Sequence, residues 1–302
     1  MNNKLTKKIC LGTVQFGMDY GIANKTGKVS KEEVFKILDF AKTNGIETLD
    51  TAHAYGVSEK VLGEFIKDRG AAFDIVSKIS DKGQLRESLS LLGAENIHGC
   101  LIHNFKDHTE NTDLWKTIEN AKKDLFVKKI GFSLYKTQEL ETVLEQNLKF
   151  DIIQVPYSIF DRRFEPYFRP LKDRGVEIHT RSAFLQGLFF MNPGTLPEKV
   201  MGAKKHLEML RKLAKENNIS ISSLCLNFVL DNPCIDKVVI GVDSLSQLKQ
   251  NIHEIFAFTG MTKENLRITP LFCHSRESGN PNQLQLDDEK ILLPFNWGKI
   301  EA

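Results

Sequence analysis

The sequence predicts a single α/β domain in which eight parallel strands close into a barrel surrounded by helices. Eight short apolar runs, each typical of a strand buried on both faces, alternate with segments whose apolar residues recur at helical spacing. No glycine-, serine- or proline-rich linker separates these units. No Gly-x-Gly-x-x-Gly follows the first apolar run, which favours a closed (β/α)8 TIM barrel over an open nucleotide-binding sheet.

The elements follow one another in a regular order along the chain. The strands are expected at residues 9–11, 46–49, 73–78, 99–103, 129–132, 152–155, 176–180 and 237–240. After the first strand, Gly12 and Gly17 indicate a loop whose backbone closely approaches another part of the protein. Ser30 and Glu33 form a capping box for the helix that ends before the second strand, and we expect Ser58 to cap the helix after that strand.

Composition limits the classes of partner. The 302 residues include 41 basic and 39 acidic residues, and no dense basic run occurs, so we expect neither a nucleic acid nor a membrane surface as a partner. Five cysteines without paired spacing indicate a reducing compartment. The amino terminus has no apolar signal core and no run of eighteen apolar residues occurs, so a cytoplasmic location is expected. The oligomeric state is left open.

The last part of the chain differs in character from the rest. Residues 1–265 are assigned to the barrel and residues 266–302 to a C-terminal tail. Residues 272–287 are polar, aperiodic and rich in turn formers, which predicts a flexible insertion, and they resemble the translated form of a dispersed bacterial DNA repeat. Residues 288–297 carry enough apolar side chains to pack back on the barrel.

Four polar residues of different chemical types fall at the ends of three successive strands. Asp50 ends the second strand and is followed by Tyr55, Lys78 ends the third, and His103 ends the fourth. A free phenol has a pKa of about 10, and a neighbouring ammonium held by a carboxylate lowers that value. These groups therefore predict a tuned proton donor with a histidine that orients a substrate oxygen. Protonating an oxygen while its carbon gains electrons requires a hydride from a cofactor.

The sequence resembles the aldo-keto reductase family. The matching segments occur in family order over roughly residues 8–257; they are Leu-Gly-Thr-Val-Gln-Phe-Gly at 11–17, Asp-Thr-Ala-His-Ala-Tyr-Gly-Val-Ser-Glu-Lys-Val-Leu-Gly at 50–63, Ser-Lys at 77–78, Leu-Ile-His at 101–103, Ile-Gly-Phe-Ser at 130–133, Gln-Val-Pro-Tyr-Ser at 154–158 and Val-Ile-Gly-Val at 239–242. The resemblance implies a barrel with a nicotinamide cofactor extended across its top. It implies Tyr55 as the general acid, Lys78 as the residue that lowers its pKa, Asp50 as the anchor of Lys78, and His103 as the residue that orients the carbonyl.

The resemblance also implies residues for the nicotinamide end of the cofactor. Ser133 and Gln154 match the residues that bind its carboxamide, whereas Leu134 stands where many members have asparagine. Arg181 stands where many members stack a tyrosine on the ring. A guanidinium plane can also stack, and its charge disfavours the oxidised, cationic ring, which favours carbonyl reduction.

The remaining contacts fall along the pyrophosphate and adenosine. By the resemblance, the positions expected to bind the rest of the cofactor are Ser182, Phe184, Gln186, Gly241, Asp243, Gln247 and Asn251, and those expected at the substrate mouth are His53 and Phe105. A second capping box, Ser244 with Gln247, makes the start of the last helix a suitable anion site. NADPH is the family default. The basic residue that often grips its 2′-phosphate is absent, and Asp243 would repel that group, so NADH is possible.

Two other functional classes are compatible with parts of this pattern. Leu134, Arg181 and the altered tail favour a cofactor-binding regulatory barrel with little or no turnover. His53 and His179, with Asp50 and His103, could form the metal site of a barrel hydrolase, but the resemblance gives Asp50 and His103 other roles and predicts no metal. The Gly-Thr-Val-Gln-Phe-Gly opening is similar to that of reductases associated with bacterial surface-polysaccharide synthesis, which suggests a sugar-like carbonyl as substrate.

Overall fold

Eight parallel strands form one closed barrel, as the sequence predicts. The computed structural model describes residues 3–22, 24, 27–259, 284–293 and 297. Within them the strands pair in chain order and the eighth returns to the first. They are β1 (Ile9–Gly12), β2 (Thr48–Asp50), β3 (Asp74–Ile79), β4 (Ile97–Ile102), β5 (Val127–Ser133), β6 (Ile152–Pro156), β7 (Glu177–Arg181) and β8 (Lys237–Gly241).

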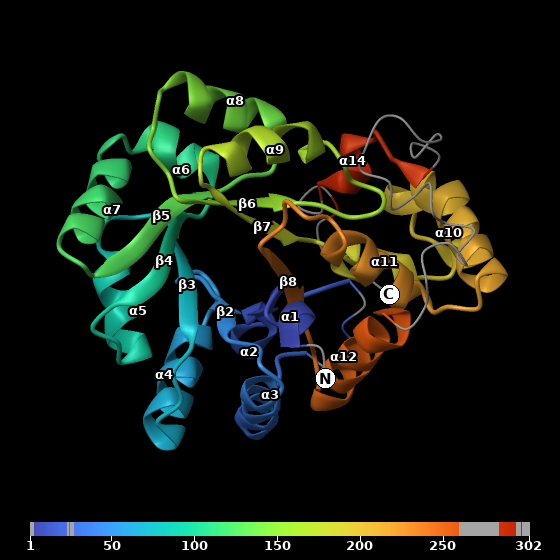
Figure 1. Cartoon of the computed structure of the whole chain (residues 1–302), viewed down its shortest axis with the longest axis horizontal. Coiled ribbons are helices and arrows are strands. Elements are labelled where there is room, and N and C mark those ends of the chain that lie inside the picture. Colours follow the sequence, from blue (N-terminus) through green and yellow to red (C-terminus); the bar gives the residue numbers. More distant parts are fainter. Residues whose placement is uncertain (1–2, 23, 25–26, 260–283, 294–296, 298–302) are drawn as a thin grey trace.

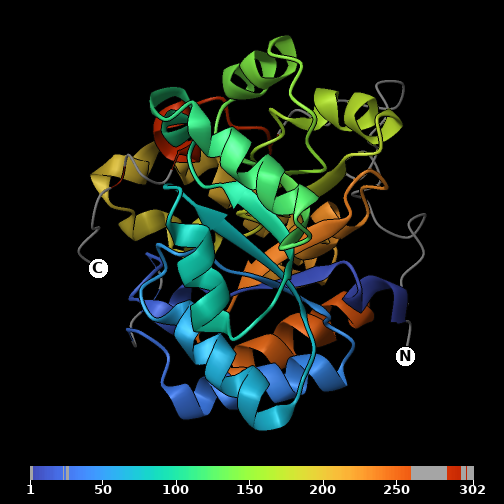
Figure 2. The ribbon, with the colours of Figure 1, turned by 90° about the vertical axis from the view of Figure 1, so that its left-hand side faces the viewer.

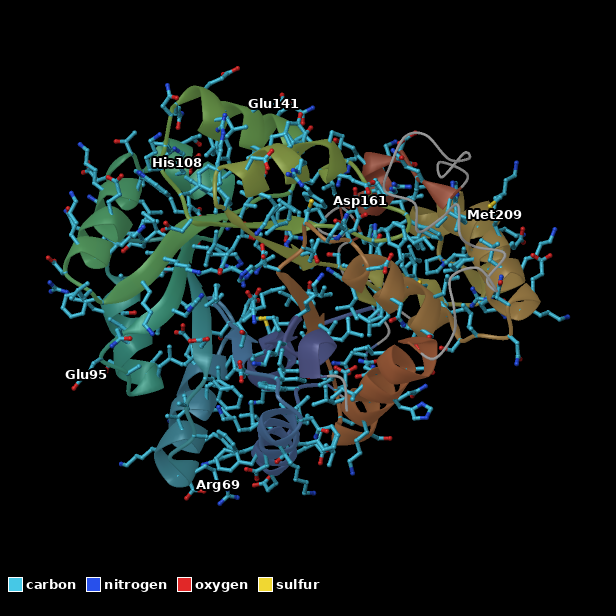
Figure 3. All side chains as sticks on the ribbon, viewed as in Figure 1. Arg69, Glu95, His108, Glu141, Asp161 and Met209 are labelled. Carbon is cyan, nitrogen blue, oxygen red and sulfur yellow. The ribbon has the colours of Figure 1, made fainter. Side chains whose placement is uncertain are left out.

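Helices surround the barrel on its outside (Figures 1 and 2). They are α1 (Asn3–Thr6), α2 (Val14–Gly17), α3 (Lys31–Thr43), α4 (Ser58–Arg69), α5 (Gln84–Leu92), α6 (Phe105–Glu110), α7 (Asp113–Lys123), α8 (Thr137–Glu145), α9 (Glu165–Asp173), α10 (Lys204–Glu216), α11 (Ile221–Leu230), α12 (Leu245–Thr259) and α14 (Glu289–Leu292), with 3₁₀ turns η1 (Leu185–Phe190), η2 (Pro193–Thr195) and η3 (Glu198–Ala203). Exposed charged residues such as Arg69 on α4 and Glu141 on α8, and Glu95 in the loop after α5, lie at the periphery of the protein (Figure 3). No described helix is long and apolar enough to cross a membrane.

The helix starts agree with the sequence at two of three positions. The Ser30 hydroxyl accepts from the Glu33 backbone N–H at 3.3 Å, and the Ser244 hydroxyl accepts from that of Gln247 at 3.2 Å. Ser58 does not cap α4, because the helix is preceded by Val57 and Ser58 is its first residue. The prediction was wrong because the Ser58 hydroxyl is used in a contact to the loop after β1.

The barrel interior below the site is filled by a small apolar cluster. Val76, Leu101 and Ile152 are fully buried and form a group separate from the main core. Val76 lies two residues before Lys78 on β3, and Ile152 lies two residues before Gln154 on β6, so each shares a face with the polar residue above it. This layer closes the barrel beneath the polar side chains.

The described part of the tail packs on the barrel, as its apolar side chains predict. Leu292 and Trp297 are buried, and the Trp297 indole N–H donates to the Lys290 carbonyl at 3.1 Å. Of the predicted insertion at 272–287, residues 272–283 lie outside the described residues, while Leu284 and Leu286 are placed and buried.

Candidate active site

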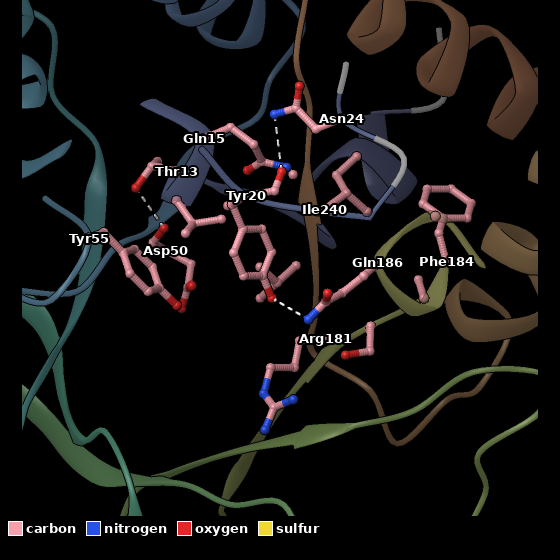
Figure 4. Close-up of a pocket in the computed structure, with 18 of the residues that line it drawn as sticks. Thr13, Gln15, Tyr20, Asn24, Asp50, Tyr55, Arg181, Phe184, Gln186 and Ile240 are labelled. Atoms are coloured by element: carbon pink, nitrogen blue, oxygen red, sulfur yellow. Dashed lines mark hydrogen bonds between the residues drawn. The ribbon is translucent and has the colours of Figure 1, made fainter. Parts of the chain in front are cut away.

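An open pocket lies at the carboxyl ends of the strands (Figure 4). This is the end at which enzymes of this architecture place their active sites. Its lining includes most of the residues singled out from the sequence, namely Asp50, Tyr55, His103, Ser133, Gln154, Arg181, Ser182, Phe184, Gln186, Gly241, Asp243 and Gln247. Lys78 is 1% exposed and lies beneath this surface.

The loop that carries Tyr55 is fixed by close contact with the loop after β1. Ser58 Oγ lies 2.9 Å from the Thr13 carbonyl oxygen and 2.8 Å from Thr13 Oγ1, and Thr13 Oγ1 donates to the Asp50 carbonyl at 3.0 Å. A Cβ atom at Gly17 would lie 1.6 Å from the Tyr55 carbonyl oxygen. Only glycine therefore permits this approach, as the sequence predicted for the first loop.

Asp50, Lys78 and Tyr55 form one hydrogen-bonded group. Lys78 Nζ lies 2.6 Å from Asp50 Oδ2 and 3.4 Å from Tyr55 Oη, and it also donates to the Thr51 carbonyl at 3.0 Å. The His103 ring meets the Tyr55 ring edge-on, with centroids 5.7 Å apart. The four groups expected to act together are therefore adjacent.

The protonation states follow from burial and from the ion pair. Burial disfavours the charged form of Lys78, but the charge and hydrogen bond of Asp50 outweigh it and raise the pKa of Lys78 to about 12. Burial also raises the pKa of Tyr55, and the Lys78 ammonium offsets only part of that increase. The expected lowering by Lys78 is thus present, while the net direction is opposite to the expectation. Burial, followed by the charge of Lys78, lowers the pKa of His103 to about 4, so its ring is neutral at pH 7.

Gln154 links this group to the pocket. Its Nε2 donates to Asp50 Oδ1 at 2.6 Å, so both carboxylate oxygens of Asp50 accept hydrogen bonds. Its Oε1 is buried without a hydrogen-bond partner in a residue that lines the pocket. An acceptor left unpaired in this way fits the amide N–H of a nicotinamide carboxamide, and Ser133 lines the pocket on the neighbouring strand.

Arg181 presents a flat cation at the end of β7. Its guanidinium carbon lies 3.8 Å from the centroid of the Tyr135 ring, and Nη2 donates to the Leu134 carbonyl at 2.9 Å. Leu134 is fully buried, so its backbone and not its side chain contributes here. Tyr135 also lines the pocket and was not singled out from the sequence.

The loop after β7 carries unusual backbone conformations beside the pocket. Ser182, Leu185 and Gln186 have φ values of 66°, 46° and 53°, in the left-handed region. Gln186 Nε2 donates to the Tyr20 hydroxyl at 2.9 Å, which joins this loop to the one after β1. Burial raises the pKa of Tyr20 to about 12, so this hydroxyl is neutral. Sequence reasoning missed Tyr20, whose position in a polar loop gives no periodic signal.

The corner between β8 and α12 is where an anion site is expected from the sequence. The Leu245 N–H donates to Glu33 Oε1 at 2.8 Å, and the Asp243 N–H donates to Gln247 Oε1 at 2.7 Å. Burial and then the charge of Asp19 raise the pKa of Asp243. Protein acceptors thus engage the Asp243 and Leu245 amides, which the sequence did not indicate, and anion binding at this corner stays a prediction.

Besides Lys78, three residues with predicted roles lie outside the pocket lining. His53 contacts Glu59 Oε2 at 3.7 Å and Glu87 Oε2 at 3.3 Å. Phe105 packs beside His108, with ring centroids 5.8 Å apart, and Asn251 is buried with 6% exposed. The described residues include no group of three or more histidines, cysteines or carboxylates that could hold a metal ion, so the four residues considered for the hydrolase alternative are not assembled into such a site.

Comparison with known proteins identifies related chains. The model of the Aldo/keto reductase family matches residues 8–268. The uncharacterised oxidoreductase YrpG of Bacillus subtilis is 25% identical over 305 residues, covering 86% of this chain and 90% of that protein. The glyoxal reductase of the same organism is 25% identical over 257 residues, covering 80% and 84%. The solved holo form of aldo-keto reductase AKR11C1 from Bacillus halodurans superimposes with a TM-score of 0.69 at 20% identity, covering 92% and 95%, which shows a shared fold.

Proposed function

Because the chain belongs to the aldo/keto reductase family, we propose that it reduces an aldehyde or ketone to an alcohol with NAD(P)H, and that Tyr55 supplies the proton. One observation carries the proposal. The Lys78 ammonium lies between Asp50 Oδ2, at 2.6 Å, and the Tyr55 hydroxyl, at 3.4 Å, at the floor of the pocket.

The bound cofactor would supply a hydride to the carbonyl carbon. Gln154 Oε1, which has no partner within the protein, would accept from its carboxamide, with Ser133 beside it. Both residues follow from the family resemblance, and the unpaired acceptor supports the assignment. The protein's other task is to deliver a proton to the carbonyl oxygen.

The residues around Tyr55 keep its hydroxyl protonated and would stabilise the phenolate that forms when the proton leaves. The raised pKa of Tyr55 keeps the phenol protonated at neutral pH. Once the proton has left, the phenolate faces the Lys78 ammonium, whose positive charge is maintained by Asp50. A neutral His103 ring carries one N–H, which can donate to the substrate oxygen and hold it against the phenol. Positioned acid catalysis of this kind contributes roughly 10²–10⁴-fold.

Arg181 favours the reductive direction. Its charge repels an oxidised, cationic nicotinamide more than a reduced, neutral one. Tyr135 supports the guanidinium plane from one side at 3.8 Å, which leaves it positioned beside the pocket.

The substrate is proposed only as a class. A small carbonyl compound fits the family, and the similarity of the opening motif to reductases of surface-polysaccharide synthesis suggests a sugar-like one. One of the Bacillus subtilis relatives is named a glyoxal reductase, so glyoxal, a small dicarbonyl, is also a compound to test.

The test uses purified full-length protein, fluorescence titration of both cofactors, and a panel of aldehydes, ketones and keto sugars. Tyr55→Phe should lower turnover by roughly 10²–10⁴-fold while leaving cofactor binding unchanged. Tyr167→Phe is the matched control, since that hydroxyl contacts Glu141 on the outer helices. Undiminished turnover in Tyr55→Phe rejects the mechanism. Stoichiometric binding without turnover of any carbonyl would support the regulatory barrel instead.

A further inference from the structure

We propose that this protein binds NADH in preference to NADPH. The residue responsible is Asp243, assisted by Gln15. This rests on the proposed function insofar as the ligand is a nicotinamide dinucleotide. The two cofactors differ by one phosphate group on the adenosine ribose, so the choice depends on what the pocket offers a hydroxyl or a phosphate at that position.

Asp243 offers an acceptor and a negative charge. It follows β8 by two residues and lines the pocket. Its Oδ1 is buried and has no hydrogen-bond partner, while its own backbone N–H is already donated to Gln247 Oε1. A buried carboxylate oxygen that accepts no hydrogen bond is destabilising, and a ribose hydroxyl can donate the missing hydrogen bond.

Gln15 offers a second acceptor from the short helix α2, which follows β1. It is 9% exposed, lines the pocket, and its Oε1 is buried without a partner. Its amide packs on the backbone of Gly241, where a Cβ atom would lie 2.4 Å from Nε2. Gly241 lies two residues before Asp243, so this contact brings the amide of Gln15 close to the segment that carries Asp243. Both need a donor, which a hydroxyl is and an ionised phosphate is not.

Two of the backbone N–H groups that a phosphate could use are occupied. At the start of α12 the Leu245 N–H is bound by the Glu33 carboxylate at 2.8 Å, and the Gln247 N–H is bound by Ser244 Oγ at 3.2 Å. A helix N-terminus holds a phosphate through free backbone N–H groups. Here a carboxylate already takes that position, so an added phosphate would meet a like charge.

The described residues that line this corner of the pocket include no cation. Among all the described residues that line the pocket, Arg181 alone carries a permanent positive charge. Arg181 lies on β7 and is engaged with the Leu134 carbonyl and the Tyr135 ring. A phosphate monoester carries about −1.5 to −2 charges at pH 7. Near Asp243 it would be repelled without compensation.

The test measures dissociation constants of the full chain for NADH and NADPH by fluorescence titration at fixed low ionic strength. NADPH should bind at least about ten-fold more weakly. Asp243→Asn, which keeps the shape and removes the charge, should reduce this difference several-fold, chiefly by strengthening NADPH. Glu32→Gln is the matched control, since this exposed residue of α3 loses the same charge outside the pocket.

Wild-type protein that binds NADPH as tightly as NADH would overturn the inference, and an unchanged ratio in Asp243→Asn would overturn the role of Asp243. Competition by ADP-ribose against 2′-phospho-ADP-ribose repeats the test on unaltered protein. Selective NADH binding without turnover of any carbonyl would contradict the proposed function alone. Absence of binding by both dinucleotides would contradict both.

Discussion

The two mouths of the barrel carry clusters of the same residue types, but only one opens into the pocket. At the carboxyl mouth Lys78 pairs with Asp50 below Tyr55 and His103. Near the amino mouth, in the first residues of their strands, Lys129 is paired with Glu177, whose Oε2 lies 3.7 Å from His98 Nε2 and 3.5 Å from His179 Nε2.

The two clusters differ in whether their side chains line the pocket. None of the charged residues at the amino mouth lines the pocket, whereas Tyr55, His103 and Asp50 do. Perturbed pKa values occur at both mouths. Burial alone would raise the pKa of Glu177, but the close contacts with the two histidines and the hydrogen bond from Lys129 outweigh it and lower the pKa well below the ordinary value. A shifted pKa thus identifies a buried ionic network, and access to the pocket identifies which network can act on a ligand.

The largest effect is expected for Lys78→Met. Removing this ammonium leaves Asp50 buried and unpaired, so the free energy of unfolding should fall by about 3–5 kcal/mol. Turnover should fall by roughly 10²-fold or more, because the Tyr55 phenolate loses its stabilising charge. Denaturant unfolding and steady-state kinetics measure the two effects. Full activity in folded Lys78→Met would contradict the prediction that the cluster at the carboxyl mouth takes part in catalysis while the cluster at the amino mouth does not.

Glu177→Gln should affect stability and not catalysis. We expect a loss of about 1–3 kcal/mol at pH 7 with kcat unchanged, because the carboxylate contacts Lys129 and two histidines away from the pocket. A carboxyl whose folded pKa is lowered contributes stability above its unfolded pKa of about 4.3, and that contribution is lost as the pH falls. The difference from wild type should therefore be largest near neutral pH and shrink below about pH 4. Unfolding curves across this range test it, and a decrease in kcat of the folded variant would show that the amino mouth contributes to catalysis.

Lys82→Met should have the smallest effect and serves as the control for Lys78→Met. Lys82 pairs with Asp113 at 3.1 Å, but the two side chains are 49% and 59% exposed. Solvent screens such a pair, so we expect a change below about 1 kcal/mol and unchanged turnover. A loss comparable to that of Lys78→Met would show that burial is not the cause of the larger effect.

The barrel and the arrangement of its polar strand ends could be predicted from sequence because both depend on local periodicity. Apolar runs of strand length define the sheet, and parallel strands bring Asp50, Lys78 and His103 to one mouth. The pairing of Lys78 with Asp50 follows almost directly from adjacent strands. This part of the site required no knowledge of loop conformation.

Contacts between loops could not be predicted in the same way. Ser58 has the sequence features of a helix cap, yet its hydroxyl contacts Thr13, 45 residues earlier. Gln15 and Tyr20 lie in the pocket because the first loop folds over β8 and meets the loop after β7, which no local pattern encodes. The partner of the Leu245 N–H at the start of α12 could not be predicted for the same reason, since Glu33 reaches it from α3.

Asp50 uses its two oxygens for different tasks. Oδ2 holds the Lys78 ammonium and Oδ1 accepts from the Gln154 amide nitrogen. The second bond determines which end of that amide is turned to the ligand, because an amide that donates on one side must present its oxygen on the other. A neutral amide at position 50 would remove the charge and also permit Gln154 to rotate. In the proposed mechanism, proton delivery and ligand orientation are therefore coupled through one carboxylate, and substitutions there would alter both together.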